Sequence, residues 1–175
     1  MKAGASLVVV TALLLGGSLT AKVSAQPTER TNVSPTTGAP SHAVSAQRIL
    51  MTIDRHDFEV SLYDNAAAAA LLKTLPQTIS MSRWGNGEYY GKISSKIPAD
   101  GEKREYFERG EVALWPEGNA LCIFFDRTPV SSDERPKMAS PGIPFGRITK
   151  GDLTAFKGMP GDFFTSIKLE LKPVG

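Results

Sequence analysis

The chain has 175 residues, of which 41% are hydrophobic and 22% are charged, as expected of one globular domain with appendages. Its formal net charge of +2 equals the contribution of Lys2 and Lys22, because no acidic residue occurs before residue 26. We therefore expect neither a nucleic-acid-binding protein, which needs a basic stripe, nor one directed to anionic membrane surfaces. The single cysteine, Cys122, excludes an intramolecular disulfide. It lies within an apolar run, so we expect a small buried hydrophobe there rather than a reactive thiol.

Residues 1–25 have the pattern of a secretory signal peptide. Lys2 supplies a minimal positive segment, and residues 7–15 form an apolar core too short to span a bilayer comfortably. The small-residue pattern that ends at Ala25 predicts cleavage before Gln26, and therefore a secreted or periplasmic protein without stable membrane insertion after cleavage. The alternative is an uncleaved anchor.

Residues 26–46 are rich in Ser, Thr, Pro and Ala and lack any apolar period, so we predict a disordered linker. The only two histidines are His42, in this linker, and His56, in a predicted turn. Two histidines in such places do not form a metal site, and we predict neither a metal nor a cofactor.

The folded domain is predicted over residues 47–175. Residues 48–53 and 58–63 read as two strands joined by a polar turn, the second with Phe58, Val60 and Leu62 on one face. Asn65, with Asp64, is predicted to cap an alanine-rich helix of about ten residues that Pro76 ends. A third strand is expected over residues 78–84, followed by a glycine-rich turn at 85–87 and a loop over 93–104.

Residues 112–125 form the predicted central hairpin, in which residues 116–119 make the turn. Its second strand, 120–125, is entirely apolar, which is typical of a strand covered on both faces. Leu121, Ile123 and Phe125 share one face, and the other face holds Cys122 and its alternate neighbours. The phase of the sequence leaves open which of these two sets points into the core.

Four prolines occur between residues 126 and 144, so we predict a long irregular loop that could hold a ligand. A short strand over 145–149, a helical turn over 152–156 capped by Asp152, and a long alternating strand over 163–171 complete the chain. About eight short strands with frequent turns favour a closed barrel or a sandwich.

Several motifs, in this order, resemble the small bacterial cyclophilin-like domain family. They are Leu62-Tyr63-Asp64-Asn65, Leu75-Pro76, Met81-Ser82-Arg83-Trp84-Gly85, Glu88-Tyr89-Tyr90-Gly91, Gly110-Glu111-Val112-Ala113-Leu114-Trp115-Pro116, Gly118 to Phe125, Thr128-Pro129 and Gly146-Arg147-Ile148. The resemblance covers roughly residues 48–171. It implies a closed cyclophilin-like β-barrel of about eight strands, mainly β, with one clear and one short helix closing its ends.

The resemblance does not carry over prolyl isomerase activity. True isomerases have a catalytic arginine in a Phe-His-Arg type motif, which this sequence lacks, and no motif matches Arg83 or Arg147 to that arginine residue by residue. Members of the family lack an established biochemical role.

The best candidate site surrounds the turn at residues 85–87, where aromatic side chains accompany an arginine and a carboxylate. Such a set can form a pocket with an apolar floor and a few fixed polar groups. In the alternative, Arg83 and Glu88 pair across the turn and the aromatic rings complete the core. The candidate ligand-binding residues are Arg83, Trp84, Glu88, Tyr89, Tyr90, Trp115, Phe125 and Thr128.

These observations predict an exported, non-catalytic module that binds a small molecule or peptide. A peptidyl-prolyl cis-trans isomerase is the alternative enzyme function, and a purely structural interaction domain is a third hypothesis. No pair of carboxylates at a readable spacing and no Ser/His/Asp order indicates another enzyme class.

Overall fold

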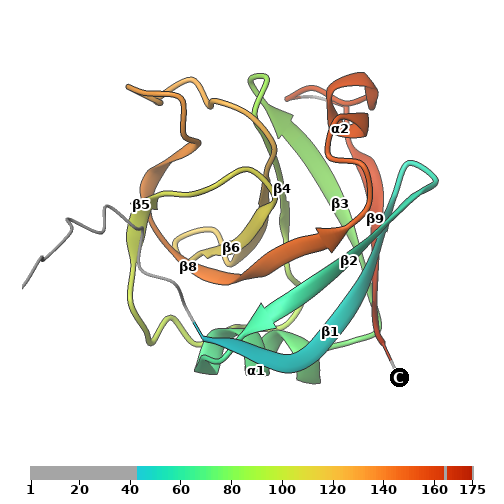
Figure 1. The fold of residues 1–175 in the computed structure, drawn as a ribbon, viewed down its shortest axis with the longest axis vertical. Coiled ribbons are helices and arrows are strands. Elements are labelled where there is room, and N and C mark those ends of the chain that lie inside the picture. Colours follow the sequence, from blue (N-terminus) through green and yellow to red (C-terminus); the bar gives the residue numbers. More distant parts are fainter. Residues whose placement is uncertain (1–42, 164, 175) are drawn as a thin grey trace, which may run out of the picture. The chain divides into compact units, whose positions relative to one another are not determined.

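A computed structural model describes residues 43–163 and 165–174, which form nine strands and two helices (Figure 1). The elements are β1 (Val44–Ile53), β2 (His56–Tyr63), α1 (Ala66–Lys73), β3 (Gln77–Trp84), β4 (Glu88–Lys92), β5 (Arg104–Tyr106), β6 (Glu111–Trp115), β7 (Ala120–Phe124), β8 (Lys137–Lys150), α2 (Ala155–Gly158) and β9 (Ile167–Pro173).

Eight of these strands close into a barrel in the order β2-β1-β9-β3-β4-β7-β6-β8, because β8 pairs again with β2. Every pairing is antiparallel, and β5 lies outside the ring, paired only with β8 within the described chain. Helices α1 and α2 lie at opposite ends of the barrel (Figure 1). Closure leaves few unpaired strand edges, and it confirms the predicted eight-stranded barrel.

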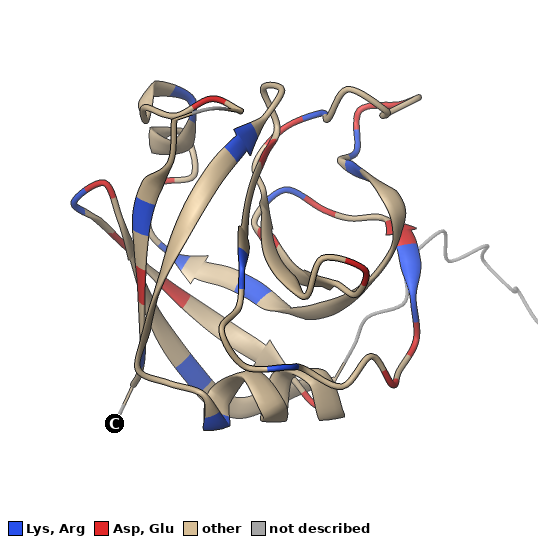
Figure 2. Cartoon of the chain, turned by 180° about the vertical axis from the view of Figure 1, so that it is seen from behind, with Lys and Arg blue, Asp and Glu red and all other residues tan. Residues whose placement is uncertain are grey.

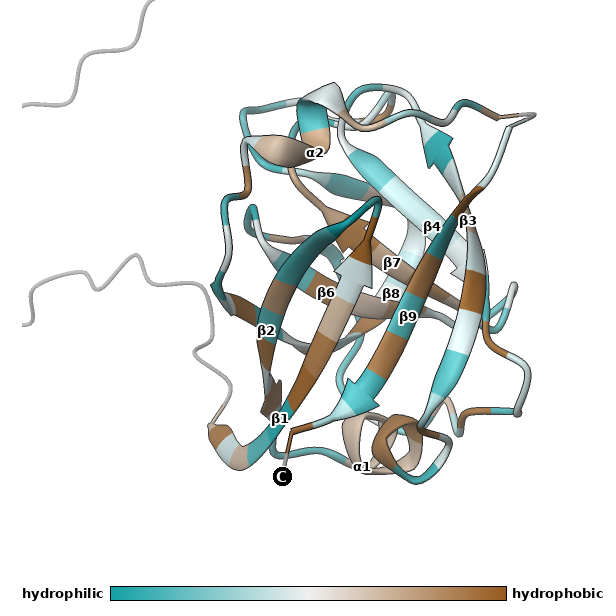
Figure 3. Cartoon of the chain, turned by 90° about the vertical axis from the view of Figure 1, so that its right-hand side faces the viewer, coloured by the Kyte–Doolittle hydropathy of each residue, from teal (hydrophilic) through white to brown (hydrophobic). Residues whose placement is uncertain are grey.

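The barrel interior is built by alternation along the strands, as Figure 3 shows for β3 and β9. In β1 the buried residues are Ile49, Met51 and Ile53. In β2, Phe58, Val60 and Leu62 are buried, as predicted. The preceding turn joins β1 to β2 through Asp54 and Arg55, both with positive φ, which matches the twist of an antiparallel hairpin. The first strand starts at Val44, four residues before its predicted start, so β1 includes the last three residues of the segment predicted as a linker.

Helix α1 has eight residues rather than ten, and its start is as predicted. The side chain of Asn65 accepts a hydrogen bond from the Ala68 N–H at 2.8 Å, which satisfies a donor of the first turn. The Asn65 amide also donates to the Pro144 carbonyl at 2.8 Å, so the same residue ties the helix to β8. Ala67, Ala68 and Leu71 are buried against the barrel.

The hairpin β6–β7 contributes to two apolar clusters, one on each face. Val112, Leu114, Leu121, Ile123 and Phe125 join the large cluster that fills the barrel. The opposite face joins a smaller cluster formed by Phe107, Ala113, Cys122, Phe124 and Met138, with Tyr90 and Trp115 packed against it. The phase that the sequence left open is thereby assigned, and Cys122 is buried, as expected.

The prediction of an irregular segment up to residue 144 was wrong, because β8 begins at Lys137 and runs for 14 residues. The strand changes partners along its length, from β5 to β6 and then to β2. Pro141 is exposed, and Pro144 lies at a register shift opposite Ala113, where a missing N–H is tolerated. The predicted strand over 145–149 is therefore the second half of a longer one.

Two boundaries near the C-terminus also differ from prediction. Strand β9 begins at Ile167 rather than at residue 163, because Thr165 donates its N–H to Asp162 Oδ1 at 2.6 Å and closes a turn. Residue 164 lies outside the described residues. Helix α2 begins at Ala155, because Asp152 Oδ1 accepts from the Thr154 N–H at 2.9 Å in a turn before the helix.

The predicted signal peptide and residues 26–42 of the predicted linker lie outside the described residues. No helix within the described part is both long and apolar enough to cross a membrane. Basic and acidic residues are interspersed along the strands and loops of the domain (Figure 2).

Candidate functional site

A cavity of about 300 Å³ opens on the outside of the barrel wall, next to the smaller apolar cluster. Four strands and the turn before β9 contribute its walls. Its lining residues are Trp84, Glu88, Tyr90, Trp115, Met138, Ala139 and Phe163. Four of these seven were predicted from the sequence: Trp84, Glu88, Tyr90 and Trp115.

Strand pairing brings the predicted residues together. Trp84 of β3 pairs with Glu88 of β4, and Tyr90 is two residues further along β4, on the same face as Glu88. Tyr90 in turn pairs with Cys122 of β7. The outer face of the sheet therefore presents aromatic rings around one carboxyl group.

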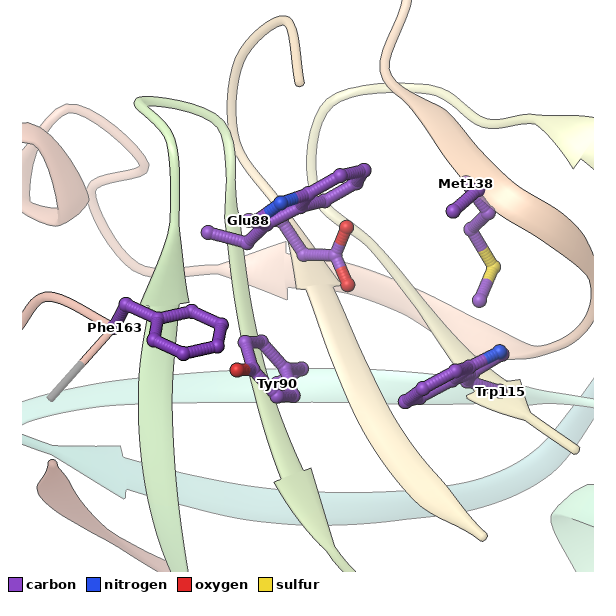
Figure 4. A pocket seen from close by; sticks show the side chains of 7 residues that line it. Glu88, Tyr90, Trp115, Met138 and Phe163 are labelled. Carbon is purple, nitrogen blue, oxygen red and sulfur yellow. The ribbon is translucent and has the colours of Figure 1, made fainter. Parts of the chain in front are cut away.

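Figure 4 shows the Glu88 carboxyl group pointing into the space between Tyr90, Trp115 and Met138. Glu88 is only 5% exposed, and its Oε2 atom is buried without a hydrogen-bond partner. Burial raises the pKa of this carboxyl group from its ordinary value of 4.5 to about 7, while a hydrogen bond with the Cys122 thiol partly opposes that rise. Burial likewise raises the pKa of Cys122 well above its ordinary range. Glu88 is thus an acid that can change its charge near neutral pH.

The Trp115 ring is held in a fixed orientation. Its indole N–H donates to Ser140 Oγ at 2.9 Å, and the Ser140 hydroxyl donates to Glu117 at 3.0 Å. On its other side, a Cβ atom at Gly118 would lie 2.5 Å from a carbon of the indole, so only glycine allows this close packing. One wall of the cavity is therefore held in a single orientation.

The turn that carries Glu88 is also locked in place. A Cβ atom at Gly87 would lie 2.2 Å from the carbonyl oxygens of Asp126 and Arg127, so the backbones touch here. The Gly87 carbonyl accepts the N–H of Phe125 at 2.9 Å. These contacts fix the start of β4, and with it the position of Glu88.

Arg83, Tyr89 and Phe125, which were also predicted, lie instead at the end of the barrel core. The Tyr89 hydroxyl donates a shared hydrogen bond to the carbonyls of Met159 and Pro160, at 3.1 and 2.7 Å. The Arg83 guanidinium lies 5.3 Å from the centre of the Phe125 ring. It donates to the carbonyls of Gly85 and Met159, rather than pairing with Glu88.

Arg83 faces a second, more open hollow of about 520 Å³. This hollow is lined by Arg83, Trp84, Gly85, Asn86, Lys157, Gly161, Asp162 and Phe163. Trp84 and Phe163 belong to both hollows and separate a charged surface from the apolar cavity.

Thr128, the last predicted residue, is buried but does not line either hollow. Its hydroxyl donates to the Lys137 carbonyl at 2.5 Å, and its N–H donates to Ser131 Oγ at 3.0 Å. Thr128 therefore ties the loop after β7 to the start of β8.

Sequence reasoning missed Met138, Ala139 and Phe163. The first two lie in the part of β8 that the prolines made look irregular. Phe163 was assigned to a strand, whereas it lies within the turn that Asp162 and Thr165 close and is 63% exposed. The available sequence signal was the turn-forming pair Gly161-Asp162 directly before Phe163. Within the described residues, no group of three or more potential ligand side chains could hold a metal ion.

Comparison with known proteins agrees with this architecture. A solved structure from Archaeoglobus fulgidus, described as the hypothetical protein AF2241, shares 25% sequence identity and superimposes with a TM-score of 0.61. The match covers 77% of this chain and 98% of the archaeal one. No curated protein matches the sequence. The family model described as cyclophilin-like matches residues 47–166, and the chain therefore belongs to the cyclophilin-like family.

Proposed function

We propose that this protein is a binding module that takes a small molecule, or one side chain of a peptide, into the cavity beside Glu88. The observation that carries the proposal is an apolar, aromatic-walled cavity with a single buried carboxyl group pointing into it. Ligand sites in proteins combine apolar walls with a few polar groups in just this way, and about 300 Å³ is at the lower end of their volumes.

The fixed Trp115 ring and the locked β3–β4 turn support the same function. Preformed walls lower the conformational cost of binding, since fewer side chains must be ordered when the ligand enters. The arrangement favours recognition over chemistry. Glu88 is the only carboxyl group among the lining residues that the structure describes, and no lysine, arginine or histidine accompanies it there.

We extend the proposal to location: the N-terminal pattern supports an exported protein that binds its ligand outside the cytoplasm, after cleavage before Gln26. Prolyl isomerisation remains the alternative that the cyclophilin-like fold suggests. No feature of the cavity favours it, because Arg83 faces the other hollow.

Intrinsic fluorescence provides the test, because Trp84 and Trp115 are the only two tryptophans of the chain and both line the cavity. Titration of the mature protein with a panel of small metabolites and short peptides should change the emission in a saturable way. A proline-containing peptide in the panel can be followed for its isomerisation rate in the same samples.

Matched variants then locate the binding event. Ala139→Phe places a ring at the exposed rim of the cavity and should abolish the response. Thr78→Phe adds the same ring at an exposed position of β3 outside the cavity, and should leave the response unchanged. The proposal fails if no compound gives a saturable change, or if Ala139→Phe and Thr78→Phe bind alike.

A further inference from the structure

The Glu88 carboxyl group has a chemical requirement that the protein itself leaves unmet. Its Oε2 atom is buried without a partner, and a buried oxygen in that state costs free energy until a donor reaches it. Among the described lining residues, the Trp115 N–H is already engaged by Ser140, and neither the Trp84 N–H nor the Tyr90 O–H bonds to this oxygen. A ligand that carries an N–H or O–H donor would supply the missing partner.

The same walls are suited to a positive charge. Three aromatic residues, Trp84, Tyr90 and Trp115, line the cavity together with Glu88. Aromatic faces attract cations most strongly where water is excluded, and a carboxylate beside them adds a direct ionic partner. No lysine or arginine is present among the described lining residues to repel such a ligand.

Resting on the function proposed above, we infer that the natural occupant of this cavity is an organic cation, a protonated amine with an apolar body. Its N–H groups donate to the Glu88 carboxylate, and its apolar body packs among Trp84, Tyr90 and Trp115. Neutral molecules of the same shape satisfy only the apolar walls, and carboxylates are repelled.

The charge of Glu88 makes binding depend on pH. Its carboxyl group has a pKa of about 7 without ligand, so it is largely protonated at about pH 5 and largely ionised at about pH 8. The titratable groups beside it are the Cys122 thiol on β7, which stays neutral over this range, and Tyr90 on its own strand. The residues lining the cavity from β3, β6, β8 and the turn before β9 are not titratable.

Three probes of matched size separate the possibilities: benzylamine, benzamide and benzoate, each titrated by tryptophan fluorescence and calorimetry. Benzylamine should bind most tightly at about pH 8 and should weaken by up to about 100-fold at about pH 5, since roughly one molecule in a hundred then carries ionised Glu88. Benzamide should bind more weakly than benzylamine at about pH 8, and benzoate should not bind.

Two variants assign the effect to this carboxyl group. Glu88→Gln keeps the shape but removes the charge, and should weaken benzylamine by at least about tenfold, remove its pH dependence and leave benzamide bound. Glu102→Gln, which removes an exposed carboxylate in the loop after β4, should behave as the unaltered protein.

The outcomes distinguish this inference from the function on which it rests. If benzamide or benzoate binds more tightly than benzylamine, and Ala139→Phe abolishes that binding, the cation assignment is overturned while the binding module stands. The cation assignment is overturned in the same way if benzylamine affinity falls as the pH rises. If none of the probes and no member of the metabolite panel binds, both the inference and the proposed function are overturned.

Discussion

Glu88 makes a quantitative prediction about stability that needs no ligand. Burial raises the pKa of its carboxyl group from 4.5 to about 7 in the folded protein, whereas in the unfolded chain the group returns to its ordinary value. The folded state therefore holds this proton more tightly than the unfolded state. The resulting stabilisation is fully present below about pH 4.5 and is lost as the pH rises through about 7.

The magnitude follows from the two pKa values. Each pH unit between them corresponds to about 1.4 kcal/mol, so the full effect is about 3 kcal/mol, of which about 2.5 kcal/mol falls between about pH 5 and pH 8. Because Glu88 is nearly inaccessible to water, solvent screening weakens this effect little. Glu88→Gln removes the titrating group and with it this part of the pH dependence.

Urea unfolding at the two pH values measures the effect. Between about pH 5 and pH 8, the unaltered protein should lose about 2.5 kcal/mol more of its free energy of unfolding than Glu88→Gln does. Every other titrating group contributes equally to both proteins and cancels in this difference. The exposed-site variant Glu102→Gln should follow the unaltered protein. An identical pH dependence in Glu88→Gln and the unaltered protein would refute the reasoning.

Three further predictions concern the barrel and the N-terminus. Glu111→Gln leaves Arg104 without its ionic partner, 2.6 Å away in a buried site, and should lower the free energy of unfolding by about 3 kcal/mol in urea; adding Arg104→Met should recover part of that loss. Phe156 stacks on both Phe58 and Phe125 at the α2 end of the barrel. Phe156→Ala leaves a cavity there and should lower the free energy of unfolding in urea by about 3–5 kcal/mol. Mass spectrometry of the exported protein should find Gln26 at the N-terminus, whereas a chain that retained Met1 would contradict the predicted cleavage.

The sequence predicted those parts of the fold that depend on residues close together in the chain. Alternation along β2 identified its buried face, and Asn65 identified the start of α1, because a strand face and a helix cap depend on neighbouring residues. The extent of β8 depends on partners far away in the sequence. Its prolines suit a strand only because Pro141 is exposed and Pro144 lies at a register shift against β6.

The candidate site, too, was predicted from the sequence only in part. The turn at residues 85–87 was recognised from its composition, yet the residues around it face two different hollows, because adjacent residues of a strand point to opposite sides. Trp84 therefore lines the apolar cavity, while Arg83 reaches over the end of the barrel core. The burial of Glu88 could not be derived locally, since it depends on Cys122 of β7 and on Met138 of β8.

The two faces of the hairpin β6–β7 have different roles, one in the fold and the other in the candidate site. The inner face, with Leu121 and Ile123, fills the barrel, so truncation there removes core packing and lowers stability. The outer face, with Trp115 and Cys122, supports the cavity and belongs to a cluster that does not share side chains with the core. Substitutions on the outer face are therefore expected to change the cavity while the barrel core stays intact.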